Sequence, residues 1–420
     1  TEIYTLSLHD ALPIYPEDLS GTVIQMVHPW VGPVADVIQS AATRFSLSNP
    51  YDIWVEVEAA GSDSALLDYL DQALIEGEPP GLVVTYPYHL MLFEDRYFSV
   101  PLTDYIMHPE WGLSPDALAD IPTIFLDQYT IDGDLTAVPI APQATVLFYN
   151  QTWAQELGFS SGPENDADFH QQSCAAVYAN NQDKDEGNDG TGGWLISFDP
   201  VTLTSWYSAF GGELTDDGVL QFDTPEARQS FGYLKSVYDE GCIWIGRRPE
   251  PYYYFANRFA LMYAGSLTQI PHQSSWMTAS ESADAWHVRG FPGPDGEQIL
   301  IGGPGLVLTA DTPEKQLAAW LFARFLLTNE VQADLAEAGF TLPVRRGALT
   351  LLTEFADRNP QWAEAVDMVD VARPLPISDS WGVGQWVLQD AIYSYMLSEK
   401  PDLDLTLEQL DAMINELTRE

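Results

Sequence analysis

The sequence predicts an α/β protein with more than one domain, whose first domain is built on a parallel, doubly wound sheet. Two observations support this prediction. The chain has 420 residues, more than a single hydrophobic core usually organises. Residues 22–85 also alternate between strand-like and helix-like segments, in the order strand, helix, strand, helix, strand. This alternation is typical of a parallel sheet covered by helices.

The first strand and helix of this pattern are predicted between residues 22 and 48. Residues 22–27 (TVIQMV) form a mainly apolar run that suits a buried strand. Pro33 is well placed to open a helix, because its fixed φ and missing N–H suit the first helical position. The helix should end before Asn49 and Pro50. Its apolar positions follow a 3.6-residue period: Val34, Val37, Ile38, Ala41, Ala42 and Phe45.

The second half of the pattern predicts two further strands and one further helix. Ile53, Val55 and Val57 alternate with other residues, as in a half-buried strand. A second helical face follows and should end at Gly77, because glycine adopts the left-handed conformation common at helix C-termini. Residues 82–85 (LVVT) form the third strand. The apolar positions of this helix are Leu66, Leu67, Leu70, Ala73 and Leu74.

Aromatic and polar residues follow the first and third predicted strands. These segments are HPWVG at 28–32 and YPYH at 86–89. Ligands of open α/β sheets bind beyond the carboxyl ends of the strands, which makes both segments candidates for a binding site. Neither contains a glycine-rich phosphate loop. Within them, His28 and His89 favour a structural or supporting role.

Beyond Asn150 the sequence predicts helices near 166–180, 201–210 and 225–240. Residues 299–310 (ILIGGPGLVLTA) then combine a strand, a glycine and proline turn, and an apolar strand. Thr312 and Pro313 follow with the residue types preferred at the start of a helix.

Composition excludes several classes of function. The formal net charge is −45, from 62 acidic and 17 basic residues, and this charge repels nucleic acid. The sequence lacks a run of 18 apolar residues that would predict a membrane-spanning helix. Residues 1–14 show no periodic pattern, and we interpret them as a non-native or disordered segment without a functional role.

The chain contains two cysteines, Cys174 and Cys242. The sequence is compatible either with two buried thiols or with a disulfide between them. Neither lies in a CxxC pair, and the seven histidines show no metal-binding spacing. An acidic loop at 183–190 (DKDEGNDG) lacks the ligand pattern of an EF-hand. We therefore predict no metal and no cofactor.

Taken together, several segments resemble the extracellular solute-binding proteins of bacterial ABC importers, in the large carbohydrate-binding group (family 1). They occur in the order of that family and cover almost everything from about residue 21. The matching segments are HPWVGPVADVIQSAATRFSLSNP, EGEPPGLVVTYPY, DGDLTAVPIAPQATVLFYNQTWAQELGF, SWYSAFGGEL, FDTPEARQSFGYLKSVYDEG, the stretch from Ile301 to Leu349, and the tail from Ala372.

The resemblance implies a type II periplasmic-binding-protein fold with two lobes, each a mainly parallel sheet flanked by helices, around a cleft. It implies that residues 15–140 and 304–343 form lobe one, and that residues 145–300 and 347–420 form lobe two. The chain would cross between lobes near 139–147, 300–306 and 343–348. No charged residue lies between Asp134 and Glu156, which suits a hinge that bends without breaking an ion pair.

The resemblance also implies a carbohydrate or polyol site, which requires aromatic faces and hydrogen-bonding side chains. We expect Trp30, Tyr86 and Tyr88 to supply contacts from lobe one, although a packing role is an equal alternative for each. Gln143 would line the crossing, and Gly303, beside Gly302, would allow close approach of the backbone to the ligand.

Lobe two would contribute the remaining contacts. Asp199 is either a ligand for sugar hydroxyls or the N-cap of a helix, and Arg373 is either a ligand contact or a surface ion pair. Trp206 is either a stacking platform or a core residue. The full set expected from this lobe is Asp199, Trp206, Gly265, Ser266, Arg373 and Trp381.

The predicted function is capture of a mono- or oligosaccharide, or a related polyol, and its delivery to an ABC membrane permease. The resemblance implies an exported, non-catalytic monomer in the periplasm or outside the cell, with or without a lipid anchor. A glycoside hydrolase is one alternative, because it also combines aromatic residues with carboxylates. A ligand-sensing ectodomain partner is the other, and it differs in its partner protein rather than in its site.

Overall fold

The computed structural model describes residues 16–90, 93, 97–131, 133–213, 215–216, 219–248, 250–375, 378 and 380–418. The predicted segment 1–14 lies outside these residues. The described chain forms two compact units. Unit 1 contains the described residues up to Pro142 and those of Gly302–Phe355, and unit 2 contains those of Gln143–Ile301 and Ala356–Glu420.

Unit 1 is built on a five-stranded sheet in the order β2-β1-β3-β17-β6. β1 (Val23–His28) pairs in parallel with both β2 (Trp54–Ala59) and β3 (Leu82–Thr85), as the alternating pattern predicted. β17 (Gly305–Leu308) pairs antiparallel with β3 and with β6 (Val138–Pro139). The sheet is therefore mixed, because the strand that returns from later in the sequence runs against its neighbours.

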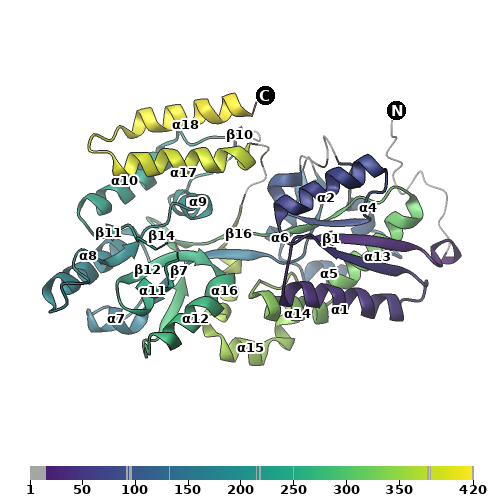
Figure 1. Cartoon of the computed structure of the whole chain (residues 1–420), viewed down its shortest axis with the longest axis horizontal. Helices are drawn as coiled ribbons and strands as arrows, with labels where there is room; N and C mark the ends of the chain where they lie inside the picture. The colour runs from purple at the N-terminus through teal and green to yellow at the C-terminus, as the bar shows by residue number, and fades with distance from the viewer. Residues whose placement is uncertain are drawn as a thin grey trace. The chain divides into compact units, whose positions relative to one another are not determined.

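Helices cover both faces of this sheet, with α2 on one side and α1 and α14 on the other (Figure 1). α1 (Pro33–Ser48) begins with its proline in the first turn and buries Ile38 and Phe45. Phe45 contacts Phe322 and Phe325 at ring-centroid distances of 5.2 and 5.6 Å. Full burial of one such side chain contributes about 1.5–3 kcal/mol, so this apolar face holds the helix on unit 1.

α2 (Asp63–Glu76) ends at Gly77, as the sequence predicted, and begins after a serine cap that the structure reveals. The Ser62 side chain accepts a hydrogen bond from the Ala65 N–H at the N-terminus, and Gly77 closes the C-terminus with a φ of 72°. The other elements of unit 1 are η1 (Pro16–Leu19), η2 (Pro87–His89), α4 (Thr103–Ile106), α5 (Pro115–Ala119), α6 (Thr123–Asp127), β4 (Thr130–Ile131), β5 (Asp134–Leu135), α13 (Pro313–Leu326), α14 (Asn329–Gly339) and η4 (Arg346–Leu351).

Unit 2 contains a seven-stranded sheet whose main path is β11-β8-β12-β7-β16-β18, with β13 also paired to β7. β7 (Gln143–Asn150) is antiparallel to β12 (Ala260–Ser266) and to β13 (Trp286–Arg289). The parallel pairings that were expected join β8 to β11 and β12, and β16 to β18, whereas β7 runs antiparallel to β12 and β13. The other strands on the path are β8 (Gly192–Leu195), β11 (Ile243–Trp244), β16 (Leu300–Gly302) and β18 (Arg373–Pro374).

The predicted helices of unit 2 are present as α8 (Asp166–Gln182), α9 (Pro200–Ala209) and α10 (Pro225–Asp239). A long pair, α17 (Trp381–Leu397) and α18 (Leu403–Leu417), ends the chain. None of the helices in the described ranges is long and apolar enough to cross a membrane. The remaining elements are α7 (Gln151–Glu156), β9 (Thr215–Asp216), β10 (Val219–Leu220), α11 (Tyr252–Ala256), η3 (Leu267–Gln269), α12 (Ile270–Ala279), β14 (Phe291–Gly293), β15 (Gly296–Gln298), α16 (Pro360–Asp367) and η5 (Val369–Val371).

The boundary between the units near the C-terminal part differs from the predicted one. The sequence assigned residues from 347 onward to lobe two, but the segment up to Phe355 belongs to unit 1. Arg345 and Gly347 both bind the carboxylate of Asp120, and Phe355 packs on Phe340 at 5.0 Å. These contacts hold the segment, with α15 (Thr353–Arg358) beginning in it, against unit 1.

Candidate functional site

The carboxyl ends of β1, β2 and β3 meet at one edge of the unit 1 sheet, because these three strands are parallel. Trp30 follows β1 and is half-buried, with its ring 5.6 Å from that of His28. Tyr86 and Tyr88 follow β3, and both are half-buried. The structure therefore brings the three aromatic candidates of unit 1 to the same sheet edge.

Tyr86 and Tyr88 form a stacked pair, with ring centroids 5.6 Å apart and an interplanar angle of 13°. The Tyr88 side chain is hydrogen-bonded to Asp63, the first residue of α2. Burial raises the pKa of the Asp63 carboxyl, and the hydrogen bond from Tyr88 opposes that rise. Burial and the nearby Asp63 raise the pKa of Tyr88, so its hydroxyl is a donor at neutral pH.

Asp63 is a further candidate site residue that was not predicted from the sequence. The signal was present, because Asp63 lies just beyond the carboxyl end of β2, the third parallel strand. The same topological rule that selected Trp30 and Tyr86 selects this carboxylate. A carboxylate beside aromatic rings can accept hydroxyl groups while a sugar ring packs on the aromatic faces.

His28 and His89 have the supporting positions that the sequence favoured. His28 is 1% exposed, and burial lowers its pKa to about 4. Burial also lowers the pKa of His89 to about 4, and its Nδ1 lies 3.2 Å from Thr85 Oγ1. Both rings are therefore neutral at pH 7, and they add no positive charge to this edge.

Gly303 is linked to the same edge through Tyr129. The Tyr129 hydroxyl donates a hydrogen bond to the Gly303 carbonyl at 2.6 Å. Burial is the main cause that raises the pKa of Tyr129, and the nearby Tyr86 raises it further. Gly303 has a φ of 136°, a conformation that residues with a Cβ rarely adopt. Gly303 itself is buried beside Tyr129, and its contact with a ligand stays a prediction.

Unit 2 brings Gln143, Gly265 and Ser266 together on neighbouring antiparallel strands, where Ser266 lies opposite Thr145. The Ser266 hydroxyl is 3.5 Å from Gln143 Oε1 and accepts from the Thr268 hydroxyl at 3.0 Å. A Cβ at Gly265 would lie 2.2 Å from Gln269 Oε1, so a larger residue at this position would displace the Gln269 amide. The result is a group of uncharged amides and hydroxyls.

Gln269 is a second residue that the sequence analysis missed. Its buried Oε1 has no hydrogen-bond partner among the described residues. A buried carbonyl oxygen without a partner is costly, and a donor from a bound molecule would remove that cost. Its place directly after the predicted Gly265–Ser266 turn was the available signal.

Asp199 has the position expected of a helix cap. Its side chain accepts hydrogen bonds from the N–H groups of Val201 and Thr202 at 3.0 and 3.1 Å, which begins α9. The residue is exposed. The capping interpretation therefore accounts for Asp199 without a ligand.

Trp206 and Trp381 are corrections to the predicted set. Trp206 is 0% exposed and packs against Phe169, Trp194 and Phe291 at 4.8 to 5.5 Å. Trp381 is 1% exposed at the start of α17. The Trp206 ring is enclosed by aromatic side chains of unit 2, so the core alternative replaces the stacking platform for it, and the buried Trp381 ring likewise offers no exposed face to a ligand.

Arg373 lies on β18 and is exposed, with its backbone paired to Leu300. When the Gln298 side-chain amide is oriented so that its nitrogen donates to Ser208, its oxygen accepts a hydrogen bond from Arg373 Nε at 2.6 Å. Arg373 thus bonds to a neutral amide rather than to a carboxylate, and its guanidinium remains exposed.

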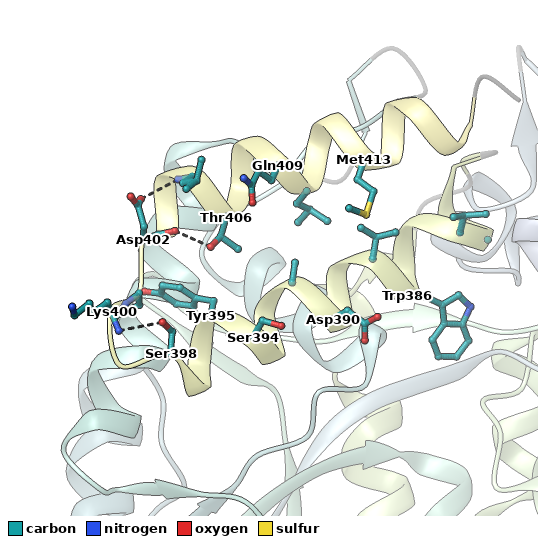
Figure 2. Close-up of a pocket in the computed structure, with 17 residues that line it drawn as sticks. Trp386, Asp390, Ser394, Tyr395, Ser398, Lys400, Asp402, Thr406, Gln409 and Met413 are labelled. Atoms are coloured by element: carbon teal, nitrogen blue, oxygen red, sulfur yellow. Dashed lines mark hydrogen bonds between the residues drawn. The ribbon is translucent and has the colours of Figure 1, made fainter.

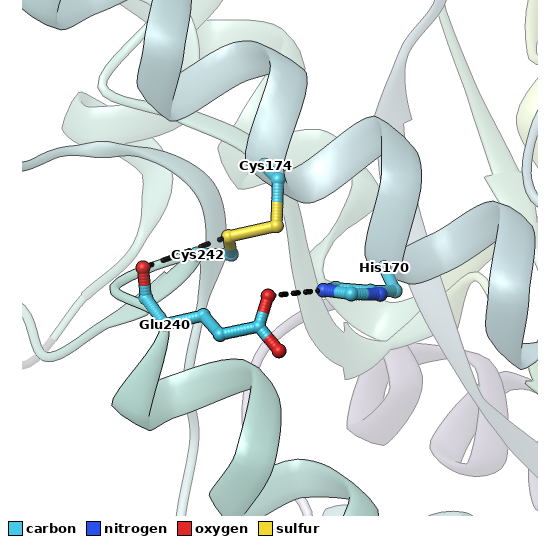
Figure 3. A group of neighbouring side chains, drawn as sticks. All are labelled: His170, Cys174, Glu240 and Cys242. Atoms are coloured by element: carbon cyan, nitrogen blue, oxygen red, sulfur yellow. Dashed lines mark hydrogen bonds and ion pairs between the residues drawn. A yellow bond between two sulfur atoms is a disulfide. The ribbon is translucent and has the colours of Figure 1, made fainter.

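Cys174 and Cys242 form a disulfide between α8 and the segment after α10, which decides between the two alternatives left open by the sequence. His170 and Glu240 lie beside it, with Nε2 and the carboxylate 2.8 Å apart (Figure 3). The potential ligand atoms of these four residues lie within 4.8 Å of one another. With both sulfurs bonded, however, the group lacks the thiolates that would hold a soft metal.

The acidic loop at 183–190 is organised by its own polar groups. Asp183 accepts hydrogen bonds from the Asn188 amide at 2.9 Å and from the Asp185 N–H at 2.6 Å, and these bonds lower its pKa. The side chains of Asp183 and Asp185 are both exposed.

Comparison with known proteins identifies the family. The model of the bacterial extracellular solute-binding protein family matches residues 41–368. The chain belongs to this family. No curated protein matched the chain in the sequence comparison.

Solved structures of solute-binding proteins share the fold across almost the whole chain. The sugar-binding protein MalE from Xanthomonas citri has a TM-score of 0.80 at 18% identity, with 95% of this chain and 98% of that chain covered. The cyclic alpha-maltosyl-1,6-maltose binding protein from Arthrobacter globiformis has a TM-score of 0.79 at 17% identity, with coverage of 95% and 99%. The UgpB structure from Mycobacterium tuberculosis, in complex with glycerophosphocholine, has a TM-score of 0.73 at 19% identity, with coverage of 95% and 99%. The predicted two-lobe α/β fold of solute-binding proteins is thereby confirmed.

Proposed function

We propose that this solute-binding protein captures a carbohydrate, either a mono- or oligosaccharide or a related polyol, for an ABC importer. The single observation that carries the proposal is the aromatic and acidic edge of unit 1. There, Tyr86 and Tyr88 stack, Tyr88 binds Asp63, and Trp30 follows the neighbouring strand. Such a set offers flat faces for sugar C–H groups and a carboxylate for hydroxyls.

The polar residues of unit 2 support the same ligand class. Gln143, Ser266 and Gln269 are uncharged, and Gln269 Oε1 lacks a partner within the described chain. Neutral amides and hydroxyls suit a neutral, hydroxyl-rich ligand. In this proposal the ligand contacts both lobes, and it favours a closed state because it binds that state more tightly.

The proposed ligand is neutral rather than anionic. The described residues at the unit 1 edge include the Asp63 carboxyl and two histidines whose pKa values burial lowers to about 4, and none of these three groups offers a positive charge to a phosphate at pH 7. The net charge of −45 adds long-range repulsion of anions. Two of the fold relatives are described as sugar- or maltosyl-maltose-binding proteins, in agreement with this proposal.

We further propose that the protein works outside the cytoplasmic membrane as a non-catalytic monomer that docks on a membrane permease. The disulfide between Cys174 and Cys242 fits an oxidising compartment. The family is described as extracellular. Repulsion between copies of so acidic a chain favours the monomer.

A thermal-shift screen tests this function. The panel contains neutral mono- and oligosaccharides, polyols, sugar acids and glycerophosphocholine, with analysis of every recovered ligand. A neutral sugar should raise the melting temperature, since a ligand that binds only the folded state stabilises it, and should be recovered intact. Recovery of a cleaved sugar would instead support a glycoside hydrolase, and stabilisation by anionic ligands alone would contradict the neutral ligand class.

A further inference from the structure

The C-terminal helix pair of unit 2 carries an open groove that the proposed ligand site does not use. The groove lies between α17 and α18 and has a volume of about 710 Å³ (Figure 2). Both helices are anchored to unit 2 by other faces. Leu388 and Ile392 of α17 and Leu407 and Ile414 of α18 are buried and do not line the groove.

Two further contacts fix α18 to unit 2. Asp411 accepts hydrogen bonds from the N–H groups of Phe222 and Asp223 at 2.8 and 2.9 Å. Arg228 binds Asp404 at 2.6 Å. The groove therefore lies between two helices that are both held against the rest of unit 2.

The groove exposes large apolar side chains from both helices. Trp386 is 58% exposed, Met413 is 51% exposed, and Val383 and Leu405 are also exposed. All four line the groove. Exposed apolar residues that gather in one hollow favour an interaction site, whereas single exposed residues are ordinary.

The lining residues follow a helical spacing on both sides. On α17 they include Val383, Trp386, Asp390 and Ser394, and on α18 they include Leu405, Gln409 and Met413. From Val383 to Ser394 the stripe spans roughly 17 Å at 1.5 Å per residue, about three helical turns. Two antiparallel helices with an open seam of this length suit a third helix, as in other helix-in-groove complexes.

The charge of the helix pair indicates the sign of the occupant. Residues 381–418 contain seven acidic residues and one basic residue, Lys400, for a formal charge of −6. Among the charged residues that line the groove, Asp390 lies near Trp386, and Asp402 lies with Lys400 at the turn between the helices. The acidic residues of this segment are Asp390, Glu399, Asp402, Asp404, Glu408, Asp411 and Glu416.

We propose that the α17–α18 groove binds an amphipathic helix of a partner protein, with apolar residues facing Trp386 and Met413 and lysine or arginine residues facing Asp390. Such a helix matches both the apolar floor and the negative charge of the groove. A second copy of this chain would bring two acidic surfaces together, and an anionic membrane would be repelled for the same reason. The positive partner helix is therefore the occupant that fits.

The test measures binding of a fluorescent 16-residue helix-forming peptide of leucine and lysine to the full chain by anisotropy. One comparison peptide has the same composition in a scrambled, non-amphipathic order, and another replaces lysine with glutamate. Trp386→Ala, or Met413→Ala as a second variant, should weaken binding of the amphipathic lysine peptide at least tenfold. Asp390→Asn should weaken it about threefold and reduce its salt dependence.

Matched controls separate groove binding from attraction to an acidic protein. Trp54→Ala removes a tryptophan of unit 1 that is 48% exposed, and Asp68→Asn removes an exposed carboxylate of α2. Both should change affinity less than twofold. Equal binding of the scrambled peptide, equal losses in the controls, or tighter binding of the glutamate peptide would overturn the proposal. Self-association that Trp386→Ala abolishes would replace the partner helix with a second copy.

Discussion

Tyr86 and Tyr88 stack with their ring centroids 5.6 Å apart, and Tyr88 is hydrogen-bonded to Asp63. The relationship joins the end of β3 to the first residue of α2, so two elements of unit 1 set the position of the rings. It gives the proposed ligand an aromatic surface with a carboxylate at its border. The following predictions use the sugar identified by the thermal-shift screen.

Removal of Trp30 should weaken binding without unfolding the protein. Trp30 is half-buried at the sheet edge, so Trp30→Ala removes a stacking face and costs about 1–2 kcal/mol of binding, roughly 5- to 30-fold in affinity. Isothermal titration calorimetry measures this loss. The melting temperature without ligand should change little, and an unchanged affinity would remove Trp30 from the site.

Removal of Trp206 should lower the stability of the protein, in contrast to removal of Trp30, which should lower only its affinity for the sugar. Trp206 is fully buried among aromatic rings, and a change from tryptophan to alanine in a core costs about 3–5 kcal/mol. Chemical unfolding followed by circular dichroism should show this loss of stability. A stable Trp206→Ala variant that fails to bind sugar would restore the original prediction that Trp206 contacts the ligand.

The Asp63 carboxylate should matter for affinity rather than for stability. Asp63→Asn keeps the shape of the side chain but replaces charge-assisted hydrogen bonds with neutral ones, which should weaken sugar binding about tenfold. Asp68→Asn, on the exposed face of the same helix, is the matched control and should leave affinity within twofold. Calorimetry that finds equal effects for the two variants would contradict a direct role for Asp63.

Loss of the disulfide should destabilise unit 2. The bond between Cys174 and Cys242 closes a loop with a sequence separation of 68 residues, and its removal by Cys174→Ser with Cys242→Ser should cost about 2–5 kcal/mol. Denaturant unfolding monitored by tryptophan fluorescence measures the change. His170→Ala is the control, because its exposed pair with Glu240 should contribute less than about 1 kcal/mol.

The Glu297 carboxyl should make stability depend on pH between about 4.5 and 7. Burial raises the pKa of Glu297 from 4.5 to about 7, and Arg289 opposes this rise. In that range the folded state holds a proton that the unfolded state has lost, so this group lowers stability as pH increases toward 7. Glu297→Gln, which imitates the protonated form, should raise the melting temperature at pH 8 relative to the native chain.

The difference in melting temperature between Glu297→Gln and the native chain should shrink toward zero near pH 4.5. The comparison must use this difference, because His28 and His89 act in the opposite direction. Burial lowers their pKa values from 6.5 to about 4, so they reduce stability as pH falls from 6.5 toward 4. A difference that stays constant from pH 4.5 to 8 would show that Glu297 is ionised throughout.

The local elements of the fold could be predicted because their signals lie within a few residues. Ser62 accepts from the Ala65 N–H, Thr312 accepts from the Lys315 N–H, and Gly77 closes α2. The parallel pairing of the strands in residues 22–85 also followed from the sequence, since alternating strands and helices favour it. The mixed sheets did not follow, because β17 and β7 pair with strands distant in sequence.

The sequence by itself determined the α/β class, the family resemblance, and the placement of Trp30, Tyr86 and Tyr88 beyond the ends of strands. Only the tertiary structure decided which tryptophans are buried, that the cysteines are bonded, and that Asp63 reaches Tyr88. The physical reason is that capping and periodicity depend on neighbours along the chain. Burial and side-chain pairing depend instead on neighbours in space, such as Phe291 beside Trp206, 85 residues away in the sequence.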